Sequence, residues 1–222
     1  MAGMRALTKE EQRLVLAALD RMRDRVLFLT GLYTGFRITE ILSLRVADVW
    51  KNGEPGRVVT VSRRHLKGGA GPYASRLQSR SIAMHPGLRA AIATYVAQRF
   101  DGRTVDGAEV LFPSRKGSNQ PIRPGQAWHI IKQAAGQAGA AERVATHSLR
   151  KTFARSVYDS TGHDIIVTQR ALGHRSIGTT ARYLDASEPE VCAAVMAIEG
   201  PGLAGLDPAP AIDARGLQAL SA

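Results

Sequence analysis

The chain has 222 residues, of which 44% are hydrophobic and 5% aromatic, and its formal net charge is +11. This length suits one globular domain, and the apolar fraction excludes a disordered chain. No stretch reaches the roughly 18 consecutive apolar residues that a membrane helix needs, so we expect no membrane partner. A single cysteine, Cys192, excludes an internal disulfide framework, and with no recognisable secretory signal it favours the cytoplasm.

The first 35 residues predict two helices. Thr8 and Glu11 have the spacing of a capping box, and apolar residues follow them at helical intervals. A first helix is therefore expected at about residues 9–22. The apolar run over residues 26–33 predicts a second, buried helix that stops at Gly35, because glycine is typical of helix C-termini.

The next segment predicts a short helix and then a β-hairpin. A helical pattern resumes at residues 38–44, so the glycine turn before it would display Arg37. Residues 58–61 are rich in β-branched side chains, and residues 81–84 can return as a second strand. The run at residues 68–72 is typical of a turn between them.

Helices dominate the second half of the chain. Proline suits the first turn of a helix, so helices are expected to open at Pro86 and Pro124. Further helical patterns lie at about residues 148–161, 164–172 and 177–184. The sequence thus predicts a mainly α fold with a small antiparallel β-hairpin, an α+β class.

Positive charge is concentrated in the body of the chain. After Leu184, one basic residue faces six acidic ones, which leaves residues 1–184 with 29 basic and 13 acidic side chains and a net charge of +16. A field of this size favours a polyanionic partner such as double-stranded DNA, although a solubilising surface would carry the same charge.

Motifs for metal or nucleotide chemistry are missing. The acidic residues are scattered, no HExxH or paired-cysteine spacing occurs, and there is no Walker loop. We therefore expect no metal, no cofactor and no small-molecule substrate. A protein of this composition that acts on phosphate esters must use its own cations and its own nucleophile.

Four short segments hold residues that suit such chemistry. They are TGFRITE around Arg37, HSLR with His147 and Arg150, LGH ending at His174, and TTARY ending at Tyr183. In this order and at these separations they resemble the tyrosine recombinase family, also called phage-type integrases, from about residue 7 to residue 184. The resemblance is to the family's catalytic domain and implies that fold, without the helical DNA-binding domain that usually precedes it.

Two arginines and two histidines suit the binding of a reacting phosphodiester. Attack at phosphorus increases the negative charge on the non-bridging oxygens, and the fork-shaped guanidinium groups of Arg37 and Arg150 can hold these oxygens. His147 lies three residues before Arg150, so both would project from the first helical turn. His174 follows a glycine at a helix end and could donate to the same oxygens; a helix-terminal histidine that interacts with the dipole is the alternative.

The remaining assignments concern the nucleophile, its support and the acid. Of the five tyrosines, Tyr183 alone matches the family's motif, and a phenol that ionises near pH ~10 needs cations or a base beside it. Glu40 lies one turn after Arg37 and can hold that guanidinium, or it forms a plain surface ion pair. The family places its general acid on the hairpin, where Lys67 is the only lysine between Lys51 and Lys116; a backbone contact to DNA is the alternative for Lys67.

The resemblance implies an enzyme that cuts one DNA strand through a 3′-phosphotyrosine intermediate and lets a 5′-hydroxyl of a partner duplex reverse the step. In the family, four protomers act on two duplexes. We assign residues 1–186 to the catalytic domain, 187–199 to a helix that docks on a neighbouring protomer or on its own body, and 200–222 to a flexible acidic tail. Type IB topoisomerase chemistry and a catalytically vestigial DNA-binding regulator are the rival interpretations.

Overall fold

A computed structural model describes residues 4–66, 79–115, 117, 119–140, 142–174, 176–181 and 183–184. In these residues the helices are α1 (Lys9–Ala17), α2 (Met22–Thr34), α3 (Ile38–Leu42), α4 (Val46–Val49), the single-turn 3-10 helix η1 (Arg63–His65), α5 (Pro86–Arg99), α6 (Pro124–Gln137), α7 (Thr146–Ser160), α8 (Ile165–Leu172) and α9 (Ile177–Ala181). The strands are β1 (Trp50–Lys51), β2 (Glu54–Pro55), β3 (Val58–Val61) and β4 (Arg80–Ala83).

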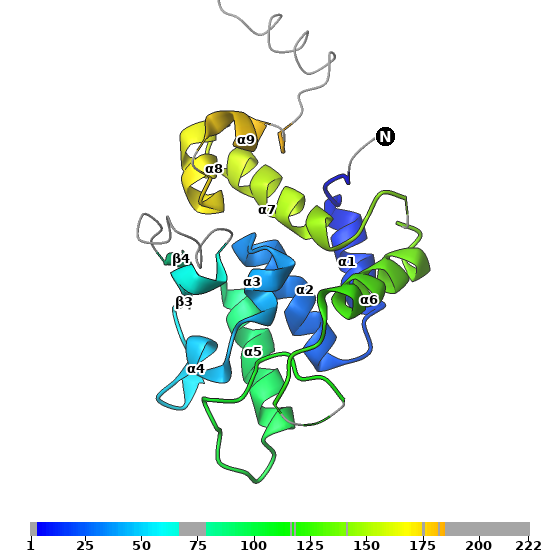
Figure 1. The fold of residues 1–222 in the computed structure, drawn as a ribbon. Helices are drawn as coiled ribbons and strands as arrows, with labels where there is room; N and C mark the ends of the chain where they lie inside the picture. Colours follow the sequence, from blue (N-terminus) through cyan, green and yellow to red (C-terminus); the bar gives the residue numbers. More distant parts are fainter. Residues whose placement is uncertain are drawn as a thin grey trace, which may run out of the picture. The chain divides into compact units, whose positions relative to one another are not determined.

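Helices build most of this part of the chain, and the strands form two small antiparallel sheets (Figure 1). In the first sheet Trp50 pairs with Pro55, and in the second Val58 pairs with Ala83. The second sheet pairs the two predicted strands, and the turn expected at residues 68–72 lies outside the described residues. The two-residue strands of the first sheet were not predicted. The mainly α class with a small antiparallel sheet is confirmed.

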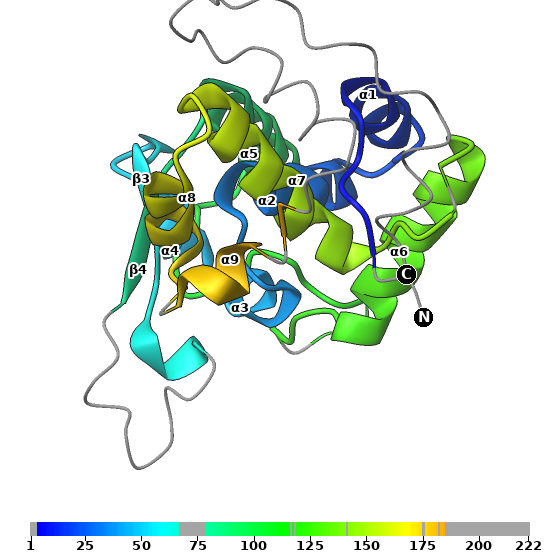
Figure 2. The ribbon, with the colours of Figure 1, turned by 90° about the horizontal axis from the view of Figure 1, so that it is seen from above.

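Helix α2 is the centre of the fold because it is apolar on two faces. Val26 and Leu27 belong to a core cluster with α3, α5 and β3, while Phe28 and Leu32 belong to a second cluster with α1 and α6. Seen from above, α7 crosses α2, with which it packs (Figure 2). This central position carries the C-terminal end of α2 to the N-terminal half of α7.

Two of the helices that matter for the site end at a left-handed glycine. Gly35 closes α2 with φ 57°, and Gly173 closes α8 with φ 64°. Such a backbone favours glycine, and at Gly35 a Cβ atom would also lie 2.2 Å from the ring of Phe153. The turn predicted at Gly35 is therefore present, and Arg37 follows it directly.

The ends of two predicted helices are wrong. The helix expected at residues 9–22 ends at Ala17, because Leu19 turns into the second core cluster and α2 begins separately at Met22. The helix expected at 177–184 ends at Ala181, so Tyr183 stands in the turn after it, with its amide bonded to the Thr180 carbonyl at 2.9 Å.

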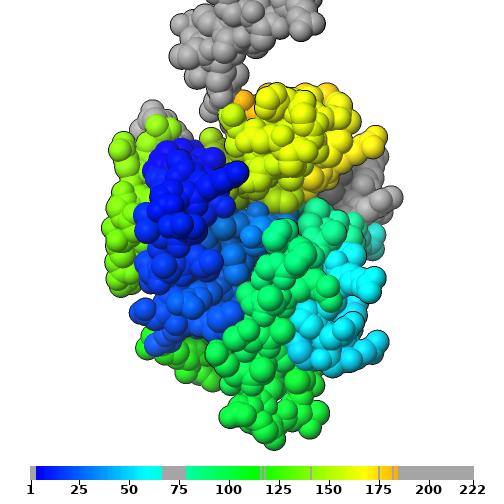
Figure 3. All heavy atoms as spheres, turned by 180° about the vertical axis from the view of Figure 1, so that it is seen from behind, coloured from blue at the N-terminus to red at the C-terminus, as the bar shows by residue number. Residues whose placement is uncertain are grey.

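From behind, the side chains of α1, α5 and α8 lie on one face of the molecule (Figure 3).

The proposed docking helix at residues 187–199 and the tail at 200–222 lie outside the described residues. The described helices include none that is long and apolar enough to cross a membrane.

The close approach of α2 and α7 predicts the effect of a methyl group at Gly31. A Cβ there would lie 2.9 Å from the Cβ atom of Leu149, which cannot move without shifting α7. Gly31→Ala should therefore lower the free energy of unfolding by about 1–3 kcal/mol in urea titrations, although alanine is the better helix former.

Gly136→Ala is the matched control, because it adds the same methyl group in the last turn of α6, at a position with nothing within 4 Å. It should raise stability by up to about 0.5–1 kcal/mol. Equal effects of the two substitutions would show that α2 and α7 do not pack as closely as described.

Candidate active site

The turn between α2 and α3 presents Arg37. Its backbone amide bonds the Glu40 carboxylate at 2.8 Å, and its Nη1 atom donates to the other carboxylate oxygen at 2.8 Å. The Arg37 side chain remains 38% exposed, whereas that of Glu40 is 1% exposed. The expected contact forms, and because Glu40 is buried it is not a plain surface ion pair.

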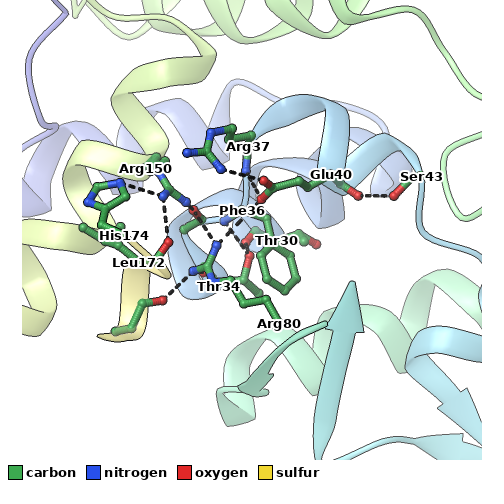
Figure 4. A network of polar contacts seen from close by, with 12 residues as sticks. Thr30, Thr34, Phe36, Arg37, Glu40, Ser43, Arg80, Arg150, Leu172 and His174 are labelled. Carbon is green, nitrogen blue, oxygen red and sulfur yellow. Dashed lines mark hydrogen bonds and ion pairs between the residues drawn. The ribbon is translucent and has the colours of Figure 1, made fainter. Parts of the chain in front are cut away.

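The guanidinium of Arg150 lies between the ends of two helices (Figure 4). Its Nη1 donates to the carbonyl of Gly35 at the end of α2, and its Nη2 donates to the carbonyl of Leu172 at the end of α8 at 2.7 Å. Nη2 also lies 2.9 Å from Nε2 of His174. Helix ends leave such carbonyls without intrahelical partners. The buried guanidinium therefore donates to acceptors that would otherwise lack a hydrogen bond.

His174 is held on both sides of its ring. Its Nδ1 atom lies 3.0 Å from the hydroxyl of Thr180 in α9, opposite the contact to Arg150. Its backbone carbonyl accepts from the side-chain amide of Gln169 at 3.0 Å. The buried ring is therefore held by Arg150 of α7 and Thr180 of α9, and the backbone of His174 is held by Gln169 of α8.

The phenol ring of Tyr183 lies among the other predicted site residues. The ring centroids of His147 and His174 lie 5.4 Å and 5.2 Å from its centroid. The Arg150 guanidinium carbon and the Lys151 ammonium nitrogen each lie 6.0 Å from it. Residues from α7, from the end of α8 and from the turn after α9 thus converge on one hydroxyl-bearing side chain.

Burial and the nearby positive charges lower the pKa of two groups in the site. Partial loss of water around the ring, followed by the charges of Arg150, Lys151 and Arg37, lowers the pKa of His147. Burial, followed by the charge of Arg37, lowers the pKa of Arg150, while Tyr183 and Glu40 act in the opposite direction. His147 is therefore a neutral imidazole at neutral pH, able to accept a proton.

Two residues of the cluster were missed by the sequence analysis. Lys151 follows Arg150 directly, and this adjacency was the available signal. Arg80, in β4, lies beneath the same helix ends and within 3.7 Å of Glu40. No local pattern marks Arg80 because its hydrogen-bond partners are backbone carbonyls, which any residue could supply.

Lys67 lies outside the described residues, so its position relative to this cluster remains a prediction from the sequence. The other six predicted residues are described: Arg37, Arg150, His147, His174 and Tyr183 come together, and Glu40 lies beneath Arg37. Among the described residues, no three His, Cys, Asp or Glu side chains gather as metal ligands would.

An open groove of about 1170 Å³ lies along α3, η1 and the start of α6. Its described lining includes Arg45, Arg64 and Arg123 with His65 and His129, and it includes no acidic side chain. Thr39 of α3 also lines the groove, so the groove lies along the helix that begins directly after Arg37.

A family model matches this sequence. The model described as the phage integrase family matches residues 5–190, which is most of the chain. The chain belongs to the phage integrase family. The resemblance inferred from the four motifs is therefore confirmed at the level of the family.

Relatives of this chain are named as recombinases. It is 30% identical over 181 residues to tyrosine recombinase XerA of Pyrococcus furiosus, covering 81% of this chain and 56% of XerA. It is 32% identical over 178 residues to the probable integrase/recombinase YoeC of Bacillus subtilis, covering 80% and 86% of the two chains. The chain thus spans little more than half the length of XerA.

The fold of the integrase chain is also found in a solved recombinase. The crystal structure of the XerH site-specific recombinase bound to its difH substrate, in a pre-cleavage complex, has a TM-score of 0.63 to it. The two are 23% identical, and the match covers 88% of this chain and 55% of XerH.

The charges around His147 predict how its pKa responds to substitution. Because a neighbouring ammonium disfavours the imidazolium form, Lys151→Met should raise the pKa of His147 toward the ordinary value of about 6.5. An NMR titration of the His147 ring protons between about pH 4.5 and pH 8 would measure this change.

Lys51→Met, in the β1–β2 hairpin, removes the same charge from an exposed position that does not contribute to the His147 pKa, and should leave the titration unchanged. A pKa of His147 above the ordinary value in the unaltered protein, or the same response to both lysine substitutions, would contradict the described electrostatics.

Proposed function

We propose that this chain is the catalytic part of a site-specific DNA recombinase, with residues 1–186 as its catalytic domain. The position of the Tyr183 ring between two imidazoles and the Arg150 guanidinium carries the proposal. The Tyr183 hydroxyl oxygen bonds to a DNA phosphorus while the bond from phosphorus to the 5′-oxygen breaks. The product is a 3′-phosphotyrosine, and attack by a 5′-hydroxyl of a partner duplex reverses the step.

Arg37 and Arg150 hold the non-bridging oxygens of the scissile phosphate. Phosphorus gains a fifth ligand during attack, and the added negative charge falls on these oxygens. Arg150 is anchored by carbonyls before substrate arrives, so little reorganisation is needed when that charge develops. Arg37 has the more exposed guanidinium and approaches from the turn after α2. Glu40 keeps Arg37 in place without touching the substrate.

The two histidines take separate roles in the proposal. His147 accepts the proton of the Tyr183 hydroxyl, which its lowered pKa allows because the ring is neutral at neutral pH. In the protein without DNA, Nε2 of His174 accepts from Arg150 while Nδ1 contacts Thr180. His174 donates a hydrogen bond to a phosphate oxygen once that oxygen takes the place of Arg150 beside Nε2. Lys67 gives its proton to the departing 5′-oxygen, a role that arginine cannot fill because its pKa exceeds ~12.

Double-stranded DNA is the proposed partner. The groove lined by Arg45, Arg64 and Arg123 offers cations for phosphates on one side of the scissile position, and the net charge of residues 1–184 supports the same partner. XerH, whose fold this chain shares, was crystallised with its DNA substrate. We further propose assembly of four copies on two duplexes, in the cytoplasm and without a metal or organic cofactor.

Replacement of the nucleophile gives the direct test. The protein is mixed with a random-sequence library of nicked DNA duplexes. After cleavage, the short fragment that carries the new 5′-hydroxyl escapes and leaves the enzyme joined to the 3′-phosphate of the remaining strand. Tyr183→Phe lacks the hydroxyl oxygen and should form no adduct that survives denaturation, while its salt-sensitive DNA binding should change by less than about two-fold.

Tyr158→Phe is the matched control because Tyr158 stacks on His163, at the other end of α7, and should leave adduct formation unchanged. Adduct formation by Tyr183→Phe would contradict the nucleophile. If the unaltered protein binds the library but forms no adduct, the DNA-binding regulator replaces the proposed enzyme. Relaxation of supercoiled DNA without exchange between duplexes would favour a topoisomerase.

A further inference from the structure

Arg80 is a buried arginine that lies outside the four motifs of the sequence analysis. It is the first residue of β4, and its side chain is 9% exposed. Nη2 donates to the carbonyl of Thr34 at 2.7 Å and to that of Ala171 at 2.5 Å, and Nη1 reaches the carbonyl of Gly35 at 3.5 Å. Its guanidinium carbon also lies 4.7 Å from the centre of the Phe36 ring.

Arg80 and Arg150 bind the same two helix ends from different elements. Arg80 reaches from β4 to residues 34–35 and 171, and Arg150 reaches from α7 to residues 35 and 172 (Figure 4). The C-terminal carbonyls of α2 and α8 carry partial negative charge, and no further helical turn follows to donate hydrogen bonds to them. Both guanidinium groups therefore tie α2 to α8 at the place where Arg150 and His174 are held.

Arg80 also shares a partner with Arg37. The carboxylate of Glu40 accepts from Arg37 at 2.8 Å through one oxygen and lies 3.7 Å from Nη1 of Arg80 through the other. A movement of Arg80 would therefore displace both residues proposed to bind the phosphate. It would displace Arg150 through the helix ends and Arg37 through Glu40. No atom of Arg80 needs to touch a substrate for this effect.

The burial of Arg80 beside Arg150 has an electrostatic cost, which indicates that Arg80 does more than stabilise the fold. Burial, followed by the charge of Arg150, lowers the pKa of Arg80 to about 9, and Glu40 offsets this only in part. Its Nε atom is buried and, like that of Arg150, has no hydrogen-bond partner among the described residues. A neutral side chain of similar size would avoid both the repulsion and the unmet donor.

We propose that Arg80 is a positioning residue, which fixes the ends of α2 and α8 and the carboxylate of Glu40 so that Arg150, His174 and Arg37 address one phosphate. Its effect on reaction rate rests on the proposed function, whereas its effect on Arg150 and His174 can be measured without DNA. Loss of Arg80 should disturb those side chains and slow strand cleavage, while leaving the groove that binds DNA intact.

The test compares three variants. Arg80→Met removes the charge and the donors at similar length, and Arg80→Lys keeps the charge but offers one ammonium in place of the fork that spans two helix ends. Arg99→Met is the matched control: Arg99 is 12% exposed, donates to the Val110 carbonyl at 2.8 Å and pairs with Glu109 at 2.5 Å, away from the site. All measurements are made well below the lowest Tm of the set.

The first measurement uses the DNA-free protein. NMR chemical shifts of the Arg150 Nη–H groups, which make its hydrogen bonds, and of the His174 ring nitrogens report these contacts. We expect Arg80→Met and Arg80→Lys to shift or broaden both sets of signals, and Arg99→Met to leave them unchanged. Unchanged Arg150 and His174 signals in Arg80→Met would overturn the proposal, whatever the protein does to DNA.

The second measurement is the rate of covalent adduct formation on one duplex selected from the library. Arg80→Met should lower this rate by about ten-fold or more, with DNA affinity changed by less than about two-fold, because positioning acts on the transition state rather than on binding. Arg80→Lys should recover Tm more fully than it recovers rate, which a purely structural role would not produce.

An adduct rate in Arg80→Met equal to that of Arg99→Met would overturn the catalytic part of the proposal. If the unaltered protein forms no adduct, the proposed function fails, and the NMR comparison still decides whether Arg80 positions Arg150 and His174.

Discussion

A guanidinium that is 1% exposed must find acceptors inside the protein, and this requirement of Arg150 organises the site. An unpaired charge in the interior costs several kcal/mol, so the fold has to bring oxygen atoms to it. The carbonyls of Gly35 and Leu172 do so, although Gly35 lies 115 residues from Arg150 in the chain. A charge placed in this way is ready to receive an anion on its remaining donors.

Several other features follow from this contact. The α2 helix has to end in a left-handed turn for the Gly35 carbonyl to face Arg150, and only glycine fits there because Phe153 occupies the space of a side chain. Gly31 permits α7 to approach α2 closely enough for the contact. The close packing of α2 against α7 in the core therefore also places the charge of Arg150 in the site.

The site also holds more positive than negative charge. Arg37, Arg80 and Arg150 surround one carboxylate, that of Glu40, and the two buried guanidinium groups repel each other. Such an arrangement lowers the stability of the protein without its ligand and favours the binding of a polyanion. Buried charges are ordinarily balanced by opposite charges, and here they are not fully balanced. This excess of buried positive charge is the physical sign that the cluster serves a function.

Local patterns in the sequence predicted the elements better than their ends. The glycine turn before Arg37, the hairpin and the helix that carries Arg150 follow from glycine, β-branched and periodic apolar residues. The break after Ala17 and the turn at Tyr183 depend on tertiary packing, which periodicity does not report. The motifs predicted that the described site residues would meet, and the position of Lys151 directly after Arg150 was a signal for it. Arg80 could not be separated from other basic residues, because its partners come from distant segments.

In the proposed reaction Arg150 acts through its geometry as well as its charge. Arg150→Lys keeps the positive charge, but an ammonium cannot hold both helix-end carbonyls and present further donors to a phosphate. The decisive measurement is the rate at which this variant forms the covalent adduct on a selected duplex, beside its affinity for the same duplex. We expect a rate at least about 100-fold lower with an affinity within about three-fold. A rate close to that of the unaltered protein would contradict this role of Arg150.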